Sequence, residues 1–116
     1  MRRLQAEFER RTPLLIPAIV IYELRFGADK SGFPERNHAR LDDFLKADFK
    51  RPAFDENDAA EAAAIRAYLE TRGAPVGPYD ILIAAQARAR NAVLVTSNRR
   101  EFERVPGLMV TDWDAG

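Results

Sequence analysis

Short apolar runs alternate along this chain with longer segments in which apolar residues recur at helical spacing. Runs of this length without polar alternation predict strands that are buried on both faces. They lie at 14–16, 92–96 and 108–110, with a weaker candidate at 49–54. The segments between them predict helices at 1–11, 18–28, 37–47, 55–72 and 78–90, and a short helical turn at 101–102.

Short buried strands that alternate with helices are typical of a parallel sheet covered by helices. We therefore expect one α/β domain over residues 1–116, an ordinary length for a single domain. In such sheets the reactive groups collect beyond the carboxyl ends of the strands. This rule places Thr96 and Asn98, at the end of the run 92–96, near the functional edge.

Composition excludes several classes of protein. The longest apolar stretch, residues 14–22, is far shorter than the roughly 18 residues of a membrane span. The N-terminus lacks a signal-peptide pattern, and the absence of cysteine excludes disulfides and thiolate metal sites, which together favour a cytoplasmic protein. The 18 basic and 18 acidic residues cancel, so net charge does not by itself indicate nucleic-acid binding.

Asp80 is a carboxylate at the start of an otherwise apolar helix. Gly77 and Pro78 are helix-start signals, and residues 81–85 have almost no polar face, which predicts a helix buried on most sides. The positive end of the helix dipole helps to keep an acid in the first turn ionised. Asp80 is therefore a candidate ligand for a hard cation, although a residue that only caps the helix would look the same.

Glu23 is the only acid in the apolar run 17–24. A lone buried carboxylate is costly unless it is paired or binds a cation. The partner of Glu23 could be a metal ion or an arginine elsewhere in the chain. Arg25 is near in sequence but lies on another face of the same helix. Thr96 and Asn98 add oxygen atoms at a strand end, and their alternative role is a strand-to-helix turn with Asn98 as N-cap.

If these side chains converge, Glu23 and Asp80 offer the oxygen ligands that Mg²⁺ or Mn²⁺ prefers. Such an ion can activate water and stabilise the charge that develops when a phosphodiester is cleaved. The single histidine, His38, lies among polar residues and is expected to be exposed to solvent, so a serine or cysteine triad is unsupported. The glycines match neither the Walker pattern nor the dinucleotide fingerprint.

Arginines cluster around the end of this helix and the next polar loop. They could form a basic rim for phosphates, or they could complement helix dipoles and solvate the surface. Those in question are Arg88, Arg90, Arg99, Arg100 and Arg104. Of these, Arg99 and Arg100 are the candidates for substrate binding.

Three segments, residues 21–28, 77–84 and 94–108, resemble PIN-domain toxins, and more narrowly the VapC toxins of type II toxin–antitoxin systems. The match runs from about Leu14 to Trp113. The resemblance implies a three-layer α/β/α sandwich and a Mg²⁺- or Mn²⁺-dependent endoribonuclease that cleaves RNA, is inhibited by a cognate antitoxin and forms a homodimer. It implies that Glu23 and Asp80 belong to an acidic cluster, with Asn98 at the position of a further acid and Thr96 beside the site.

The chain departs from the family pattern at its start. Family members begin with a strand that ends in a metal-binding aspartate, and residues 1–11 instead resemble the helix that follows that strand. We therefore expect an N-terminally truncated PIN-like domain. The alternative functions are a catalytically impaired relic that only binds an antitoxin or its own copy, and an unrelated α/β interaction domain.

Overall fold

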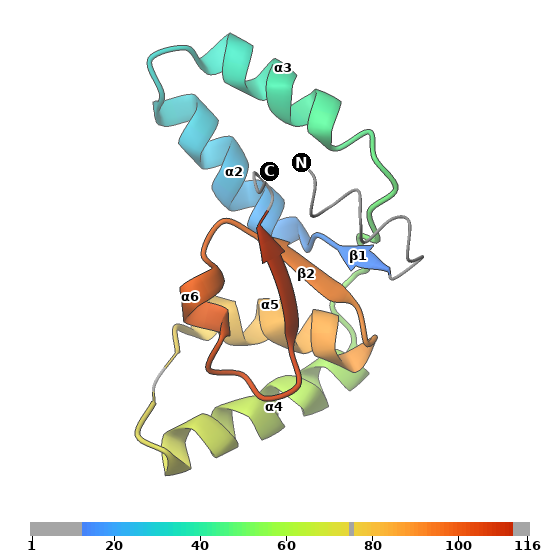
Figure 1. Cartoon of the computed structure of the whole chain (residues 1–116), viewed down its shortest axis with the longest axis vertical. Helices are drawn as coiled ribbons and strands as arrows, with labels where there is room; N and C mark the ends of the chain where they lie inside the picture. The colour runs from blue at the N-terminus through green and yellow to red at the C-terminus, as the bar shows by residue number, and fades with distance from the viewer. Residues whose placement is uncertain (1–12, 75, 113–116) are drawn as a thin grey trace.

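The computed structural model describes residues 13–74 and 76–112, so the helix expected at 1–11 lies outside the described residues. The elements follow one another in the order expected of an α/β domain (Figure 1). They are β1 (Leu14–Leu15), α2 (Ala18–Lys30), α3 (Pro34–Phe44), α4 (Glu56–Thr71), α5 (Pro78–Ala89), β2 (Val93–Thr96), α6 (Arg99–Phe102) and β3 (Met109–Asp112). No helix in the described ranges is long and apolar enough to cross a bilayer.

The strands form a parallel sheet in the order β1-β2-β3. All four residues of β2 are buried, as its apolar sequence predicts. The strand expected at 49–54 is wrong: only Lys50 pairs, in an isolated bridge with Leu15, because Pro52 cannot donate to a ladder. The last strand begins at Met109, since the backbone N–H of Leu108 still donates to Val105 in the preceding turn.

Helix α5 is the central helix of the fold. Six of its twelve residues are buried, and it packs against α4, β2, α2 and α6. Its core contacts include the fully buried Ile83 and Leu94, which join helix and sheet. In Figure 1, α2 and α3 form an antiparallel pair at one end of the molecule and α4 lies at the other end. The prediction of a helix buried on most sides is therefore confirmed.

Two arginines at the end of α5 attach α4 to it. Arg90 donates to both carboxylate oxygens of Asp58, at 2.5 and 3.0 Å, while Arg88 donates to Glu61 and to the carbonyl of Pro106. Asp58 is completely buried and also forms a capping box with Asp55 at the start of α4. The guanidinium of Arg90 lowers the pKa of Asp58, although desolvation opposes it. Arg88 and Arg90 thus hold helices together, which corrects their expected role in a basic rim.

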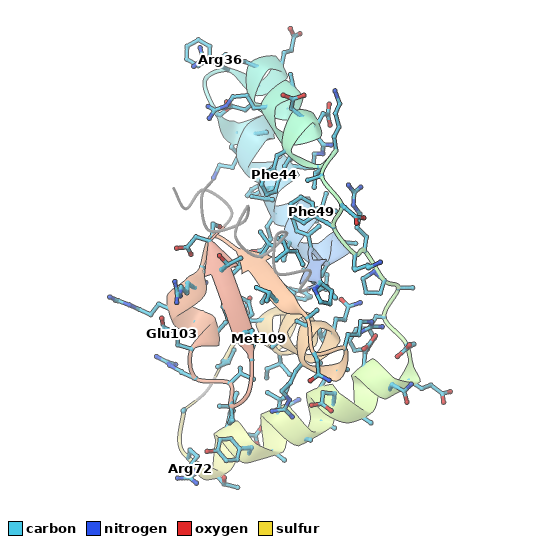
Figure 2. All side chains as sticks on the ribbon, turned by 45° about the vertical axis from the view of Figure 1, so that its right-hand side comes forward. Arg36, Phe44, Phe49, Arg72, Glu103 and Met109 are labelled. Atoms are coloured by element: carbon cyan, nitrogen blue, oxygen red, sulfur yellow. The ribbon has the colours of Figure 1, made fainter. Side chains whose placement is uncertain are left out.

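His38 joins α2 and α3 and is half-buried, so the expectation of an exposed histidine is wrong. Its Nδ1 lies 3.0 Å from Arg25 and its Nε2 lies 2.7 Å from Asp29. Figure 2 shows Phe44 and Phe49 close together near β1, with ring centroids 4.9 Å apart. The ring contact joins α3 to the segment that bridges to β1 at Lys50.

Candidate active site

Asp80 occupies the first turn of α5, where the N-cap residue is Gly77. Glycine has no side chain to cap the helix, and the Asp80 carboxylate makes no capping hydrogen bond in its place. Its Oδ2 atom lies against Gly77, 3.5 Å from the position that a Cβ would take there. The structure thus shows no hydrogen-bonded cap by Asp80, which leaves a stabilising effect on the helix dipole as the structural alternative to a metal ligand.

Three carboxylates from different elements interact electrostatically at this point. The pKa of Asp80 is raised, first by desolvation and then by the negative charges of Glu23 on α2 and Glu101 on α6. The packing of α5 against both α2 and α6 brings these helices together. In residues 13–74 and 76–112, no ion pair or hydrogen bond neutralises Glu23, Asp80 or Glu101. We call these three residues the acidic cluster.

Glu23 is exposed, which corrects the premise that it is a buried acid. The apolar run around it faces the core on one side only, and Glu23 lies on the other side. Arg25 is not its partner, because that guanidinium bonds to His38 and, at 2.5 Å, to Asp42. Glu23 therefore reaches the vicinity of Asp80 without a counter-ion from its own helix.

Glu101 is the member of the acidic cluster that sequence reasoning did not select. It lies in α6, five residues after the end of β2, and so near the carboxyl edge of the sheet. This position could have identified Glu101 from the sequence, because residues just beyond the carboxyl end of a strand are candidate site residues. Its effect on Asp80 depends on the packing of α6 against α5, which the sequence does not show.

Thr96 and Asn98 form a turn at the end of β2. The buried Thr96 hydroxyl accepts a hydrogen bond from the backbone N–H of Asn98 at 3.1 Å. Asn98 occupies the N-cap position of α6, but its side chain makes no capping bond. The predicted strand-to-helix turn is therefore present, and Thr96 stabilises it. The predicted N-cap bond from the Asn98 side chain is absent, and that side chain is exposed at the start of α6.

The expected basic rim is much reduced. Arg99 lies 3.7 Å from Glu103 in an exposed ion pair, and Arg104 also has an interaction of its own. Arg100 is exposed, and none of the ion pairs of the described chain includes it. Figure 2 shows Glu103 at the outer side of α6. Arg100 is the cation here that remains available to a phosphate.

The donor set fits a hard divalent cation. Within the described ranges, no three His, Cys, Asp or Glu side chains lie close enough to hold an ion jointly. Open Mg²⁺ sites, however, commonly use one or two carboxylates and complete their coordination with water and substrate phosphate. Glu23 and Asp80 supply two carboxylates, and their unneutralised charge favours a cation between them.

A comparison with family models decides the family: the PIN-domain model matches residues 2–108. The chain belongs to the PIN-domain family. Its VapC-like character is shown by a tRNA(fMet)-specific endonuclease VapC of Salmonella typhimurium, 44% identical over 86% of this chain and 75% of the relative. Ribonuclease VapC2 of Haemophilus influenzae is 40% identical over the same shares.

Solved structures of PIN-domain proteins agree with this placement. The DNA-bound VapBC of Salmonella typhimurium matches with a TM-score of 0.74 and 41% identity, over 95% of this chain and 83% of that chain. The VapBC2 of Rickettsia felis bound to a promoter DNA fragment matches with a TM-score of 0.78 and 35% identity, over 97% and 84%. The resemblance to VapC proteins and the α/β fold class are confirmed, while the roles of individual site residues stay predictions.

Proposed function

We propose that this VapC-family chain is a divalent-metal-dependent endoribonuclease and the toxin of a toxin–antitoxin pair. The observation that carries the proposal is the packing of α2 and α6 against α5, which brings the charges of Glu23 and Glu101 near enough to act on Asp80 with no counter-ion for any of the three in the described residues. The ribonuclease names of relatives that are 40% and 44% identical support the same activity.

In this proposal Asp80 and Glu23 hold the ion, and Glu101 adds negative charge beside it. A bound Mg²⁺ or Mn²⁺ would supply an activated water and a Lewis acid for phosphodiester hydrolysis. Such hydrolysis would form one phosphorus–oxygen bond to water and break one to a ribose oxygen, which would take up the proton that the water loses. Asp80 serves as a ligand in its ionised form, so protons compete with the ion at this carboxylate.

The remaining site residues orient the RNA. The Thr96 hydroxyl fixes the turn that presents Asn98, whose side-chain amide can donate to a phosphate oxygen. Arg100 attracts the RNA backbone, and Arg99 adds to this attraction only when it leaves Glu103. We assign Asn98, Arg99 and Arg100 to substrate binding and Thr96 to positioning.

We also infer a cognate antitoxin as protein partner, because the solved relatives from Salmonella typhimurium and Rickettsia felis are VapBC complexes. A homodimer is part of the same proposal.

The test is cleavage of RNA in Mg²⁺, in Mn²⁺ and in a chelator, with wild type, Asp80→Asn and the control Asp43→Asn. Asp43 is an exposed acid on α3 whose only ion pair among residues 13–74 and 76–112 is with Lys46, so its variant is expected to keep wild-type activity. An ion displaced by about 1 Å costs on the order of 10²-fold in rate, so Asp80→Asn loses at least that much. Cleavage that survives the chelator, or that Asp80→Asn leaves intact, contradicts the proposal.

A further inference from the structure

A pocket of about 440 Å³ lies at the edge of the sheet where the strands begin, away from the acidic cluster. Its apolar walls are Pro13, Leu15, Pro52 and Ala92, and its cations are Lys50, Arg51 and Arg90. Pro13 and Ala92 directly precede β1 and β2, which run parallel, and this fixes the edge at which the pocket lies. None of the described residues that line it is an acid. We call it the amino-edge pocket.

Hydrogen bonds on two sides hold the segment between α3 and α4 that forms one wall of this pocket. The backbone of Lys50 donates to Leu14 at 2.8 Å and accepts from Ile16 at 3.0 Å. The carbonyl of Pro52 accepts from the buried side chain of Gln86 on α5 at 3.0 Å. Figure 1 shows the segment passing beside β1 on its way to α4. The wall is therefore held in place without a ligand, which lowers the cost of binding one.

Two of the three cations in the pocket have no acidic partner in the part of the chain that the structure describes. Arg90 is paired with Asp58. No ion pair among the described residues includes Lys50 or Arg51, and both of these residues are exposed. The Arg51 guanidinium donates to the carbonyl of Leu45, which leaves its positive charge uncompensated. Free cations beside apolar walls match a ligand with an anionic group and a less polar body.

A nucleotide has this combination of groups. A guanidinium can bind its phosphate through two hydrogen bonds, and an ammonium can bind it as a point charge. Its base can pack on apolar side chains or stack on a guanidinium plane. An inorganic anion would leave the apolar walls uncovered, and a metal cation would be repelled by the three positive charges.

Helix α5 connects the amino-edge pocket to the acidic cluster. Asp80 lies in its first turn and Arg90 is its C-cap residue, so a rise of about 1.5 Å per residue separates them by about 15 Å along the helix axis. At about 3.4 Å per stacked nucleotide, roughly four to five nucleotides cover that distance. One RNA strand is therefore long enough to occupy both places.

We propose that the amino-edge pocket binds a nucleotide of the RNA substrate outside the cleaved bond, with Lys50 and Arg51 on its phosphate. This inference rests on the proposed nuclease function and adds a second RNA-binding site to it. An RNA that is only long enough to fill the acidic cluster cannot reach the pocket. Only longer RNA should therefore gain affinity from these two cations.

The experiment compares Lys50→Gln/Arg51→Gln with the control Lys46→Gln/Arg66→Gln, which lowers the net charge by the same amount. Lys46 and Arg66 are exposed and lie outside the pocket. The exchange Lys50→Arg/Arg51→Lys keeps both charges, and thermal melts check that each variant folds. Affinity is measured by fluorescence anisotropy in a chelator at several salt concentrations, and kcat and KM in Mg²⁺, with RNAs of about 3 and about 12 nucleotides.

The double glutamine variant is expected to bind the longer RNA about 10-fold or more weakly and to raise its KM by a similar factor, with kcat unchanged. Loss of one phosphate contact should also lower the slope of log affinity against log salt by about 0.7. The short RNA should bind wild type and this variant equally. The charge-preserving exchange and the control should stay close to wild type.

The proposal is overturned if the double glutamine variant binds the longer RNA as well as the control does. It is also overturned if affinity for the short RNA falls equally, which assigns the two cations to the acidic cluster. A variant that changes binding of adenosine monophosphate or of a polyglutamate peptide, but not of RNA, overturns it as well. If wild type binds RNA through Lys50 and Arg51 but cleaves none in Mg²⁺ or Mn²⁺, the nuclease function fails while the pocket keeps its RNA.

Discussion

The contact between Arg90 and Asp58 should dominate the stability of the α4–α5 pair, and Arg90→Ala tests this. The variant leaves the Asp58 carboxylate fully buried, with only the backbone N–H of Asp55, at 2.9 Å, as a remaining hydrogen-bond donor. Removal of one partner from a buried ion pair costs about 3–5 kcal/mol, because the other charge is left uncompensated. That is a large part of the roughly 5–15 kcal/mol by which a domain is stable.

Asp58→Ala should lower the free energy of unfolding less than Arg90→Ala does. This holds even though it also removes the capping box, which is worth about 1 kcal/mol. The Arg90 side chain is 28% exposed and keeps its hydrogen bond to the carbonyl of Gln86 at 2.9 Å, so water and that carbonyl can satisfy it. In the double variant neither charge is buried alone. Its cost should therefore fall below the sum of the single variants, by a coupling of about 0.5–3 kcal/mol.

Urea unfolding followed by far-UV circular dichroism measures these free energies. The matched control is Arg66→Ala on α4, the helix that carries Asp58; the Arg66 pair with Glu70 is exposed on both sides, at 70% and 63%. Exposed pairs contribute about 0–1 kcal/mol. If Arg90→Ala costs no more than Arg66→Ala, the buried ion pair does not hold α4 to α5 and the reasoning is wrong.

The same contact predicts a pH dependence. Because the pKa of Asp58 is lowered below its ordinary value of 3.8, its contribution is complete above that value and is lost as the pH falls through the folded-state pKa. Wild type should therefore lose stability below about pH 4. The loss should be smaller in Arg90→Ala, in which the main cause of the lowered pKa is gone.

The remaining predictions concern the candidate active site. The raised pKa of Asp80 means that its ionised form destabilises the fold, so Asp80→Asn should raise the melting temperature of metal-free protein at any pH above the folded-state pKa of Asp80. Mg²⁺ at 100 times its Kd should stabilise wild type by about 2.7 kcal/mol and Asp80→Asn hardly at all, which thermal melts with and without the ion can check. Thr96→Val should remove the hydrogen bond to Asn98, cost about 0.5–1.5 kcal/mol in urea unfolding, and reduce RNA cleavage more than Thr96→Ser, which keeps the hydroxyl.

Local patterns in the sequence determined most of the fold. The apolar run 92–96 predicted a buried strand and the apolar turns after Pro78 predicted a buried helix, and the structure has both. Asp55 at the start of α4 forms the cap that its residue type predicts. These features depend on residues within a few positions of one another, so the sequence contains all the information that they need.

The membership of the candidate site depended on long-range packing instead. Asp80 at its helix start could be identified from the sequence, but the approach of Glu101 required α6 to pack against α5. The arginines show the same limit, since Arg90 found its partner Asp58 32 positions away. A charged side chain bonds to whichever opposite charge the tertiary structure brings near it, and hydrophobic periodicity carries no information about that choice.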